Sequence, residues 1–121
     1  MAKILIVDDD QTLLALYSEL LKGEGYEIDL AIDGEGGLEK ASRGGYDLIL
    51  LDVNLPKRDG LSIVKDLKEK KPLSPNGKIC FLTNAIEVVD REEVESLGIT
   101  SLLKSSLTPE QFLSEVKGML G

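Results

Sequence analysis

The chain has 121 residues, which is the size of one ordinary domain, and carries a formal net charge of −8. Apolar residues make up 42% and charged residues 30%, which is typical of a soluble globular protein and excludes a disordered one. Proteins that bind the phosphate backbone of nucleic acids need a basic surface, and the excess of acidic residues argues against one, so we expect no nucleic-acid partner. No apolar run approaches the ~20 residues that span a bilayer, and no secretion signal is evident, so we expect no membrane partner and a cytoplasmic location.

Two residue types limit the chemistry further. The chain has no histidine, which excludes mechanisms that need an imidazole base of its own. Its one cysteine, Cys80, lies in an apolar segment, so a disulfide framework and a cysteine-rich metal site are both excluded. Cys80 is predicted to be a small buried apolar side chain.

Five short segments have the patterns of β-strands. Residues 4–7, 48–51 and 79–82 are continuous apolar runs, which indicate strands buried on both faces of a parallel sheet. Residues 27–32 alternate polar and apolar, with one face toward water, and residues 100–103 are only half apolar. These two segments are predicted to be the edge strands.

Helical patterns follow each predicted strand. The first ends at Gly23 and Gly25, and the last begins with a capping box at residues 108–111. The apolar positions that mark the five helices are Leu13, Leu14, Leu16, Tyr17, Leu20 and Leu21; Leu38 and Ala41; Leu61, Val64 and Leu67; Val89, Val94 and Leu97; and Phe112, Leu113, Val116 and Leu120.

The alternation predicts an α/β fold with one domain over residues 1–121. A doubly wound, five-stranded parallel sheet in the order 2-1-3-4-5 places both half-polar strands at the edges. In such a sheet the carboxyl ends of the strands share one edge, and ligands bind there.

The polar residues that follow the predicted strands gather at this edge. They are Asp8, Asp9 and Asp10 after the first strand, Asp52 and Asn54 after the third, Thr83 and Asn84 after the fourth, and Lys104 after the fifth. The second strand ends in Asp33 and Gly34, which we interpret as a plain turn.

This set of side chains suits phosphoryl transfer onto a carboxylate. Carboxylates held close together repel unless a cation lies between them, and Mg²⁺ takes oxygen ligands of this kind. A hydroxyl and an ammonium opposite the ion would hold the remaining oxygens of a phosphoryl group. Asp52 ends a buried strand, where an unpaired carboxylate is costly, whereas Asp10 is expected to cap the helix that follows it.

The motifs resemble the receiver domain of two-component response regulators, the CheY-like proteins with a flavodoxin-like fold. The likeness covers essentially the whole chain. It is carried by residues 4–10 (ILIVDDD), residues 50–56 (LLDVNLP), and the pairs Asp59-Gly60, Leu82-Thr83 and Leu103-Lys104.

The resemblance implies a phosphoacceptor switch that catalyses only its own phosphoryl uptake and loss. Asp52 would take the phosphoryl group from a histidine kinase or a phosphotransfer protein, and a downstream protein effector would read the result. Mg²⁺ would be held by Asp8, Asp9, Asp52 and the backbone carbonyl of Asn54, while Thr83 and Lys104 would contact the phosphoryl group.

Three positions depart from the family pattern. Ser105 stands where a proline usually follows the lysine, Ser101 stands at the usual aromatic position, and Asn84 replaces a small residue. These departures leave open an interaction module that keeps the fold but is not phosphorylated. A second alternative is a haloacid-dehalogenase-like phosphatase, whose nucleophile motif residues 8–13 match, although that reading leaves Asp52 without a role.

Overall fold

The structure is a computed structural model that describes residues 2–53, 55, 57–70, 76–83, 96–97, 99–104 and 107–120. The helix predicted around residues 89–97 lies outside this set, apart from residues 96 and 97, whose backbone is helical. The described elements are β1 (Lys3–Val7), α1 (Gln11–Gly23), β2 (Glu27–Ala31), α2 (Gly34–Arg43), β3 (Leu48–Asp52), α3 (Gly60–Glu69), β4 (Lys78–Thr83), β5 (Thr100–Leu103) and α5 (Pro109–Leu120).

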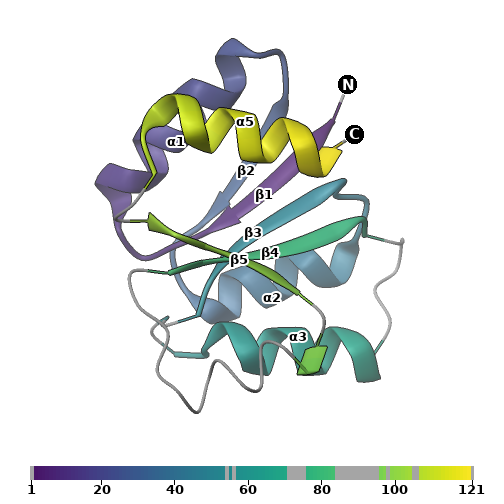
Figure 1. The fold of residues 1–121 in the computed structure, drawn as a ribbon. Helices are drawn as coiled ribbons and strands as arrows, with labels where there is room; N and C mark the ends of the chain where they lie inside the picture. The colour runs from purple at the N-terminus through teal and green to yellow at the C-terminus, as the bar shows by residue number, and fades with distance from the viewer. Residues whose placement is uncertain are drawn as a thin grey trace.

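The five strands form one parallel sheet in the order β2-β1-β3-β4-β5, as predicted (Figure 1). The continuous apolar runs occupy the interior strands β1, β3 and β4, and both half-polar strands lie at the edges. In the register, Val7 lies opposite Leu51 and Asp52 lies opposite Leu82. The residues that follow β1 and β3 therefore emerge side by side at the carboxyl edge.

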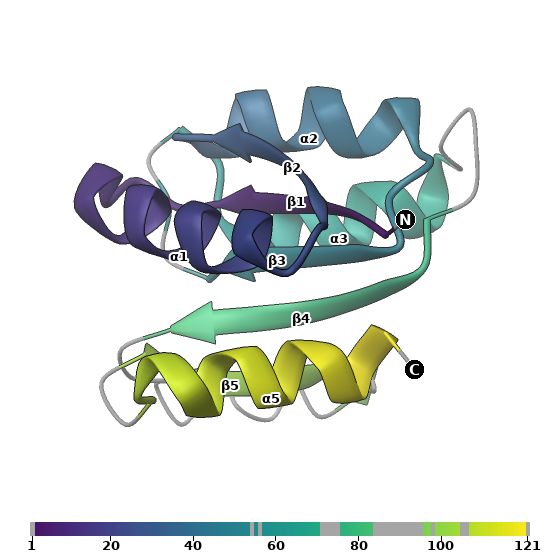
Figure 2. The same cartoon turned by 90° about the horizontal axis from the view of Figure 1, so that it is seen from above.

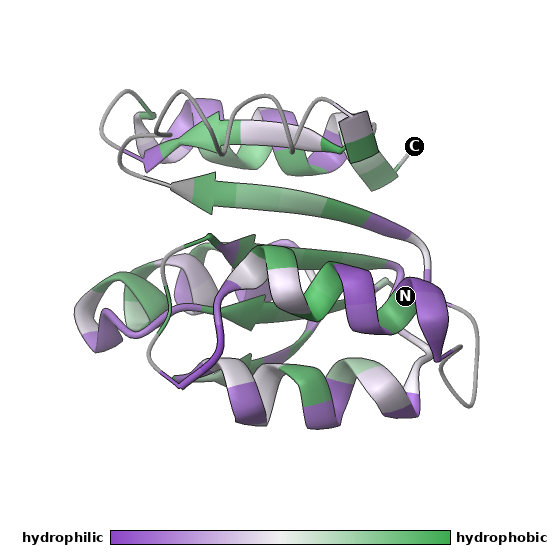
Figure 3. Cartoon of the chain, turned by 90° about the horizontal axis from the view of Figure 1, so that it is seen from below, coloured by the Kyte–Doolittle hydropathy of each residue, from purple (hydrophilic) through white to green (hydrophobic). Residues whose placement is uncertain are grey.

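Helices cover both faces of the sheet. Helices α1 and α5 lie on one face, and α2 and α3 lie on the other (Figures 1 and 2). Each face has its own apolar core, and Figure 3 shows the hydrophobic strands between helices of mixed polarity. Within the described part of the chain, no helix combines the length and the apolar character needed to cross a bilayer.

The helix N-termini are capped by side chains that precede them. Asp10 accepts a hydrogen bond from Leu13 N at 3.1 Å, which confirms its predicted role as the cap of α1. At α5, Gln111 N donates to Thr108 Oγ1 at 3.1 Å and Thr108 N donates to Gln111 Oε1 at 2.9 Å, so the predicted capping box is present. The sequence therefore specified these helix starts locally.

Two details of the prediction were wrong. Asp33 is not part of a plain turn, because its carboxylate accepts a hydrogen bond from Gly36 N at 2.8 Å and so caps α2. In α1, Leu16 is 45% exposed, whereas Leu14, Tyr17 and Leu21 are buried. Leu13 and Leu20 are partly buried against the same core, so Leu16 is the predicted apolar position that turns away from it. The ring of Tyr17 stacks on Phe112 of α5 with centroids 4.0 Å apart.

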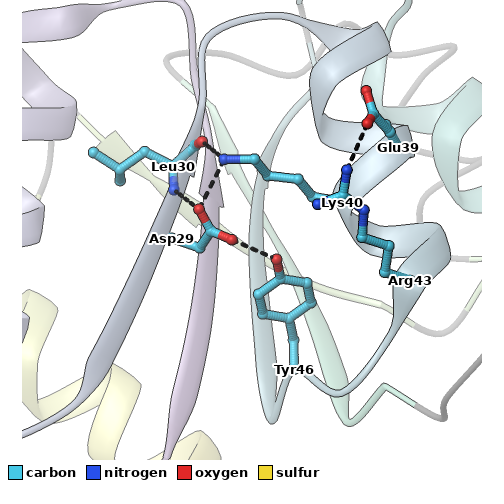
Figure 4. Close-up of polar contacts among 6 residues, drawn as sticks. All are labelled: Asp29, Leu30, Glu39, Lys40, Arg43 and Tyr46. Atoms are coloured by element: carbon cyan, nitrogen blue, oxygen red, sulfur yellow. Dashed lines mark hydrogen bonds and ion pairs between the residues drawn. The ribbon is translucent and has the colours of Figure 1, made fainter.

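The polar face of β2 is also less open to water than its alternating pattern predicts. Asp29 Oδ1 accepts a hydrogen bond from Lys40 Nζ at 2.7 Å, and its Oδ2 accepts one from the Tyr46 hydroxyl at 2.7 Å (Figure 4). Partial burial alone would raise the pKa of Asp29, but the Lys40 ammonium and the Tyr46 hydroxyl hold it below its ordinary value. This cluster joins the edge strand to α2 and to the start of β3.

Candidate functional site

Three carboxylates meet at the carboxyl ends of β1 and β3, as the order of the strands predicts. One carboxylate oxygen from each of Asp8, Asp9 and Asp52 lies within 4.8 Å of the others. Asp8 is 1% exposed and Asp52 is 6% exposed, while Asp9 faces solvent. Two of the three acids are therefore buried, where a carboxylate is costly unless it is paired.

The Lys104 ammonium joins the two buried acids. Its Nζ lies 2.5 Å from Asp8 Oδ2 and donates a hydrogen bond to Asp52 Oδ2 at 2.9 Å. Burial alone would lower the pKa of Lys104, but the two carboxylates outweigh this effect and raise it above its ordinary value. Lys104 is thus a fully charged counter-ion shared between β1 and β3.

Asp8 is fixed by its own backbone surroundings. Its Oδ1 accepts a hydrogen bond from Asp10 N at 3.0 Å, and its backbone N–H donates to Ala31 O at the end of β2 at 3.1 Å. Asp8 Oδ2 is buried and accepts no well-aligned hydrogen bond from the described residues, and Lys104 is its ion-pair partner. Such an oxygen has coordination capacity left for a hard cation.

Together these groups can hold a divalent cation with oxygen ligands. Two of the three clustered carboxylates are buried and all three lie close together, and carboxylate oxygens are ligands that Mg²⁺ takes. The ammonium adds positive charge beside the same acids, where it would meet an anionic ligand. The site is therefore suited to a metal ion together with a phosphoryl group.

The structure does not describe the side chains of several site residues that were predicted from the sequence. Thr83 ends β4 opposite Leu103, so its backbone is next to the site, but its side chain lies outside the described part. Asn54 lies outside the described residues, as do Asn84 and Ser105. The assignments of these residues therefore stay predictions.

The position usually held by an aromatic residue is occupied by Ser101, an exposed residue of the edge strand β5. Its place on the edge strand agrees with the prediction, and no described interaction links its side chain to the acids.

The structure explains Gly60 and adds contacts that the sequence did not reveal. A Cβ at Gly60 would lie 2.4 Å from the Asp52 carbonyl oxygen, so only glycine fits where α3 begins against the end of β3. Lys57 Nζ lies 3.4 Å from Asp33 Oδ2 and ties the loop after Asp52 to the start of α2. The sequence signal for the Asp33 cap, an aspartate followed by glycine at the start of a helical pattern, is present in the sequence.

Comparisons with known proteins agree with this geometry. Residues 4–117 match the family model for the response regulator receiver domain. The chain is 35% identical over 115 residues to the transcriptional regulatory protein DltR of Streptococcus agalactiae, covering 95% of this chain and 50% of DltR. It is 36% identical over 118 residues to the alkaline phosphatase synthesis transcriptional regulatory protein PhoP of Bacillus subtilis, covering 98% of this chain and 48% of PhoP. The chain thus spans about half the length of these curated relatives.

Solved structures show the same fold. The chemotaxis protein CheY4 of Vibrio cholerae superposes with a TM-score of 0.81 at 31% identity, with 98% of each chain covered. The response regulator TrrA of Thermotoga maritima, solved in complex with Mg²⁺-BeF, superposes with a TM-score of 0.78 at 34% identity and covers 98% of this chain and 99% of TrrA. The chain therefore belongs to the response regulator receiver domain family, the phosphoacceptor switches of two-component signalling.

Proposed function

We propose that residues 1–121 form a single receiver domain in which Asp52 is the phosphoacceptor. The observation that carries this proposal is the pairing of the buried Asp52 carboxylate with the Lys104 ammonium beside Asp8. Asp52 ends an interior strand beside two further acids, and one ammonium is shared between Asp52 and Asp8. A carboxylate in this place is suited to become an acyl phosphate.

Receiver domains generally use Mg²⁺, and the acids of this chain are suited to it. Asp8, Asp9 and Asp52 would hold the ion, with the backbone carbonyl of Asn54 as a further ligand. Bound Mg²⁺ would offset the negative charge shared by the carboxylates and the incoming phosphoryl oxygens. The buried Asp8 Oδ2, which has no well-aligned hydrogen bond within the described part, supports this assignment.

A receiver domain is not a classical enzyme, and the proposed chemistry acts on its own side chain. An Asp52 oxygen attacks the phosphorus of a phosphohistidine on a partner protein, the new O–P bond forms, and the P–N bond breaks. The electron pair of the P–N bond goes to the departing imidazole nitrogen, which takes a proton from water, so the partner's histidine is regenerated as neutral imidazole. Lys104 and Thr83 would then contact the phosphoryl oxygens, which carry roughly −1.5 to −2 charge.

The partners follow from this chemistry. A histidine kinase or phosphotransfer protein would donate the phosphoryl group, and a protein effector would read the altered surface. The curated relatives are named transcriptional regulatory proteins. The expectation of no nucleic-acid partner therefore applies only to these 121 acidic residues. It says nothing about the other half of the relatives, which this chain does not match.

Intact-mass analysis tests the proposal. The chain is incubated with acetyl phosphate and Mg²⁺, and we expect a gain of about 80 Da that disappears in Asp52→Asn. Asp10→Asn is the matched control, because Asp10 caps α1 and asparagine also caps. No mass gain in the wild-type chain would contradict the proposal and favour the unphosphorylated interaction module. A gain that depended on Asp8 and Asp10 instead would favour the phosphatase-like alternative.

A further inference from the structure

Lys57 lies in the loop between β3 and α3 and has a backbone conformation that lysine rarely adopts. Its φ is 67°, and among the described residues it is the one non-glycine residue with a positive φ. The left-handed region crowds Cβ against a neighbouring carbonyl, and lysine lacks the short polar side chain with which Asn or Asp offsets that cost. Such strain persists only where the surrounding structure holds it, and it concentrates at functional sites.

The start of α2 holds this strained residue. Asp33 Oδ2 lies 3.4 Å from Lys57 Nζ, and Asp33 is itself fixed because Gly36 N donates to its Oδ1 at 2.8 Å. At Gly34, a Cβ would lie 1.8 Å from the Arg58 carbonyl oxygen, so the two backbones touch. The loop after Asp52 is therefore in contact with the start of α2 at two successive residues.

The other end of the loop is fixed by α3. Arg58 Nε donates a hydrogen bond to Ser62 Oγ at 2.9 Å, and the Arg58 guanidinium forms an ion pair with Asp66. Gly60 N donates to Val53 O at 2.9 Å, which closes the loop directly behind Asp52. Lys57 thus stands at the midpoint of a short segment whose ends are both held.

The segment of residues 31–37, which we call the β2–α2 segment, also contacts the strand that carries Asp8. Ala31 O accepts a hydrogen bond from Asp8 N at 3.1 Å. At Gly37, a Cβ would lie 2.7 Å from Val7 Cγ1, so α2 packs closely on the last residue of β1. The β2–α2 segment therefore touches both parts of the chain that carry the buried acids.

We infer that Lys57 is a positioning residue: its ion pair with Asp33 locks the loop after Asp52 onto the β2–α2 segment and so sets the place of Asp52 relative to Asp8. The inference rests on the proposed function, since it concerns how the acid site is prepared for phosphoryl uptake. An exposed ion pair contributes little to stability, so a role confined to folding would leave the strain of Lys57 without a purpose.

Lys57→Gly distinguishes a role in positioning Asp52 from a role confined to folding. Glycine adopts a positive φ without penalty, so the thermal unfolding midpoint is expected to stay unchanged or to rise. The initial rate of phosphoryl uptake from acetyl phosphate, followed by intact mass, is expected to fall about three- to tenfold, because the loop after Asp52 loses its ion pair to Asp33. Asp33→Asn keeps the helix cap and removes the charge, so it is expected to lower uptake in the same way.

Lys57→Arg keeps the cation and is expected to retain at least half of the wild-type rate, about a twofold change at most. Lys117→Gln is the matched control, because it removes an exposed lysine 3.0 Å from Glu24, and its uptake is expected to equal that of the wild type. Wild-type rates in both Lys57→Gly and Asp33→Asn would overturn the inference. Failure of the wild-type chain to take up phosphoryl would instead overturn the proposed function.

If Lys57→Gly lowers the unfolding midpoint, uptake is compared with wild type at the same interval below each midpoint. A rate that recovers fully under this correction overturns the inference, and a rate that stays depressed supports it.

Discussion

Lys104 Nζ lies 2.5 Å from Asp8 Oδ2, a carboxylate oxygen with almost no exposure to solvent. The same ammonium donates to Asp52 Oδ2, so one cation offsets two buried anions from different strands. Replacing Lys104 leaves both carboxylates without this counter-ion. Removing one partner of a buried ion pair typically costs about 3–5 kcal/mol.

Lys104→Met is therefore expected to lower the free energy of unfolding by about 3 kcal/mol in the presence of EDTA. Mg²⁺ is expected to recover part of this loss, since a divalent cation would satisfy the same carboxylates. Urea denaturation with EDTA and with Mg²⁺ measures both effects. Lys117→Met, which breaks an exposed ion pair, is the control and should change stability by less than about 1 kcal/mol. A Lys104→Met chain as stable as the control without metal would contradict this account.

Alkaline pH should remove the contribution of Lys104 gradually. Its pKa in the folded state is raised above the ordinary value of 10.5, so the folded state binds this proton more tightly than the unfolded chain does. The stabilisation is complete below the unfolded-state pKa and is lost as pH rises through the folded-state pKa. The stability difference between wild type and Lys104→Met is thus expected to be constant near neutral pH and to shrink above about pH 10.4. A stability difference that grows as pH rises would show that folding lowers the pKa of Lys104 instead of raising it.

The hydroxyl of Tyr46 should matter more than its place in a loop suggests. It is buried and donates to Asp29 Oδ2 at 2.7 Å, and burial together with Asp29 raises the pKa of Tyr46 above its ordinary value. Tyr46→Phe is expected to cost about 1 kcal/mol, at the low end for a hydrogen bond to a charged group because Asp29 is partly exposed. Chemical denaturation measures the loss, and Tyr26→Phe, which alters a tyrosine with no described hydroxyl contact, should stay within about 0.5 kcal/mol.

Acid should weaken the same cluster. The pKa of Asp29 is below its ordinary value in the folded state, so its contribution is complete above the unfolded-state pKa, about 3.9, and is lost as pH falls through the folded-state value. Because the Tyr46 hydroxyl is one of the groups that lower this pKa, the cost of Tyr46→Phe is expected to be constant near neutral pH and to decrease in acid as Asp29 takes up its proton. A cost that is unchanged in acid would mean that the hydroxyl contributes through packing alone.

The sheet order and the acid cluster could be predicted because both depend on short-range patterns. Asp8 and Asp52 each follow a buried apolar run, and the parallel register then places them together whatever the loops do. The Asp10 cap and the capping box at residues 108–111 are likewise local signals. These parts of the fold need no information about distant contacts.

The remaining features depend on how elements pack. Asp29 and Tyr46 are 17 positions apart, and their hydrogen bond forms only because the residues just before β3 reach past β1 to the edge strand β2. Leu16 is exposed because another face of α1 meets the sheet. The six apolar positions of that helix did not determine which face this would be. The left-handed backbone conformation of Lys57 could not be predicted, because lysine does not favour it and the surrounding loop imposes it.

Cys80 is expected to be unreactive in the folded protein. It is fully buried in β4, and burial raises the pKa of its thiol to about 12, so the reactive thiolate is scarce at mildly alkaline pH. Labelling with a thiol reagent should therefore proceed only through unfolding, at a rate that rises with urea concentration as the unfolded fraction rises. Ser114→Cys in a Cys80→Ala background places a thiol at an exposed position of α5 and should react at once without urea. Equal labelling of Cys80 and of the exposed thiol in native buffer would show that β4 opens locally, because a strand held between β3 and β5 exposes its side chains only when the sheet separates.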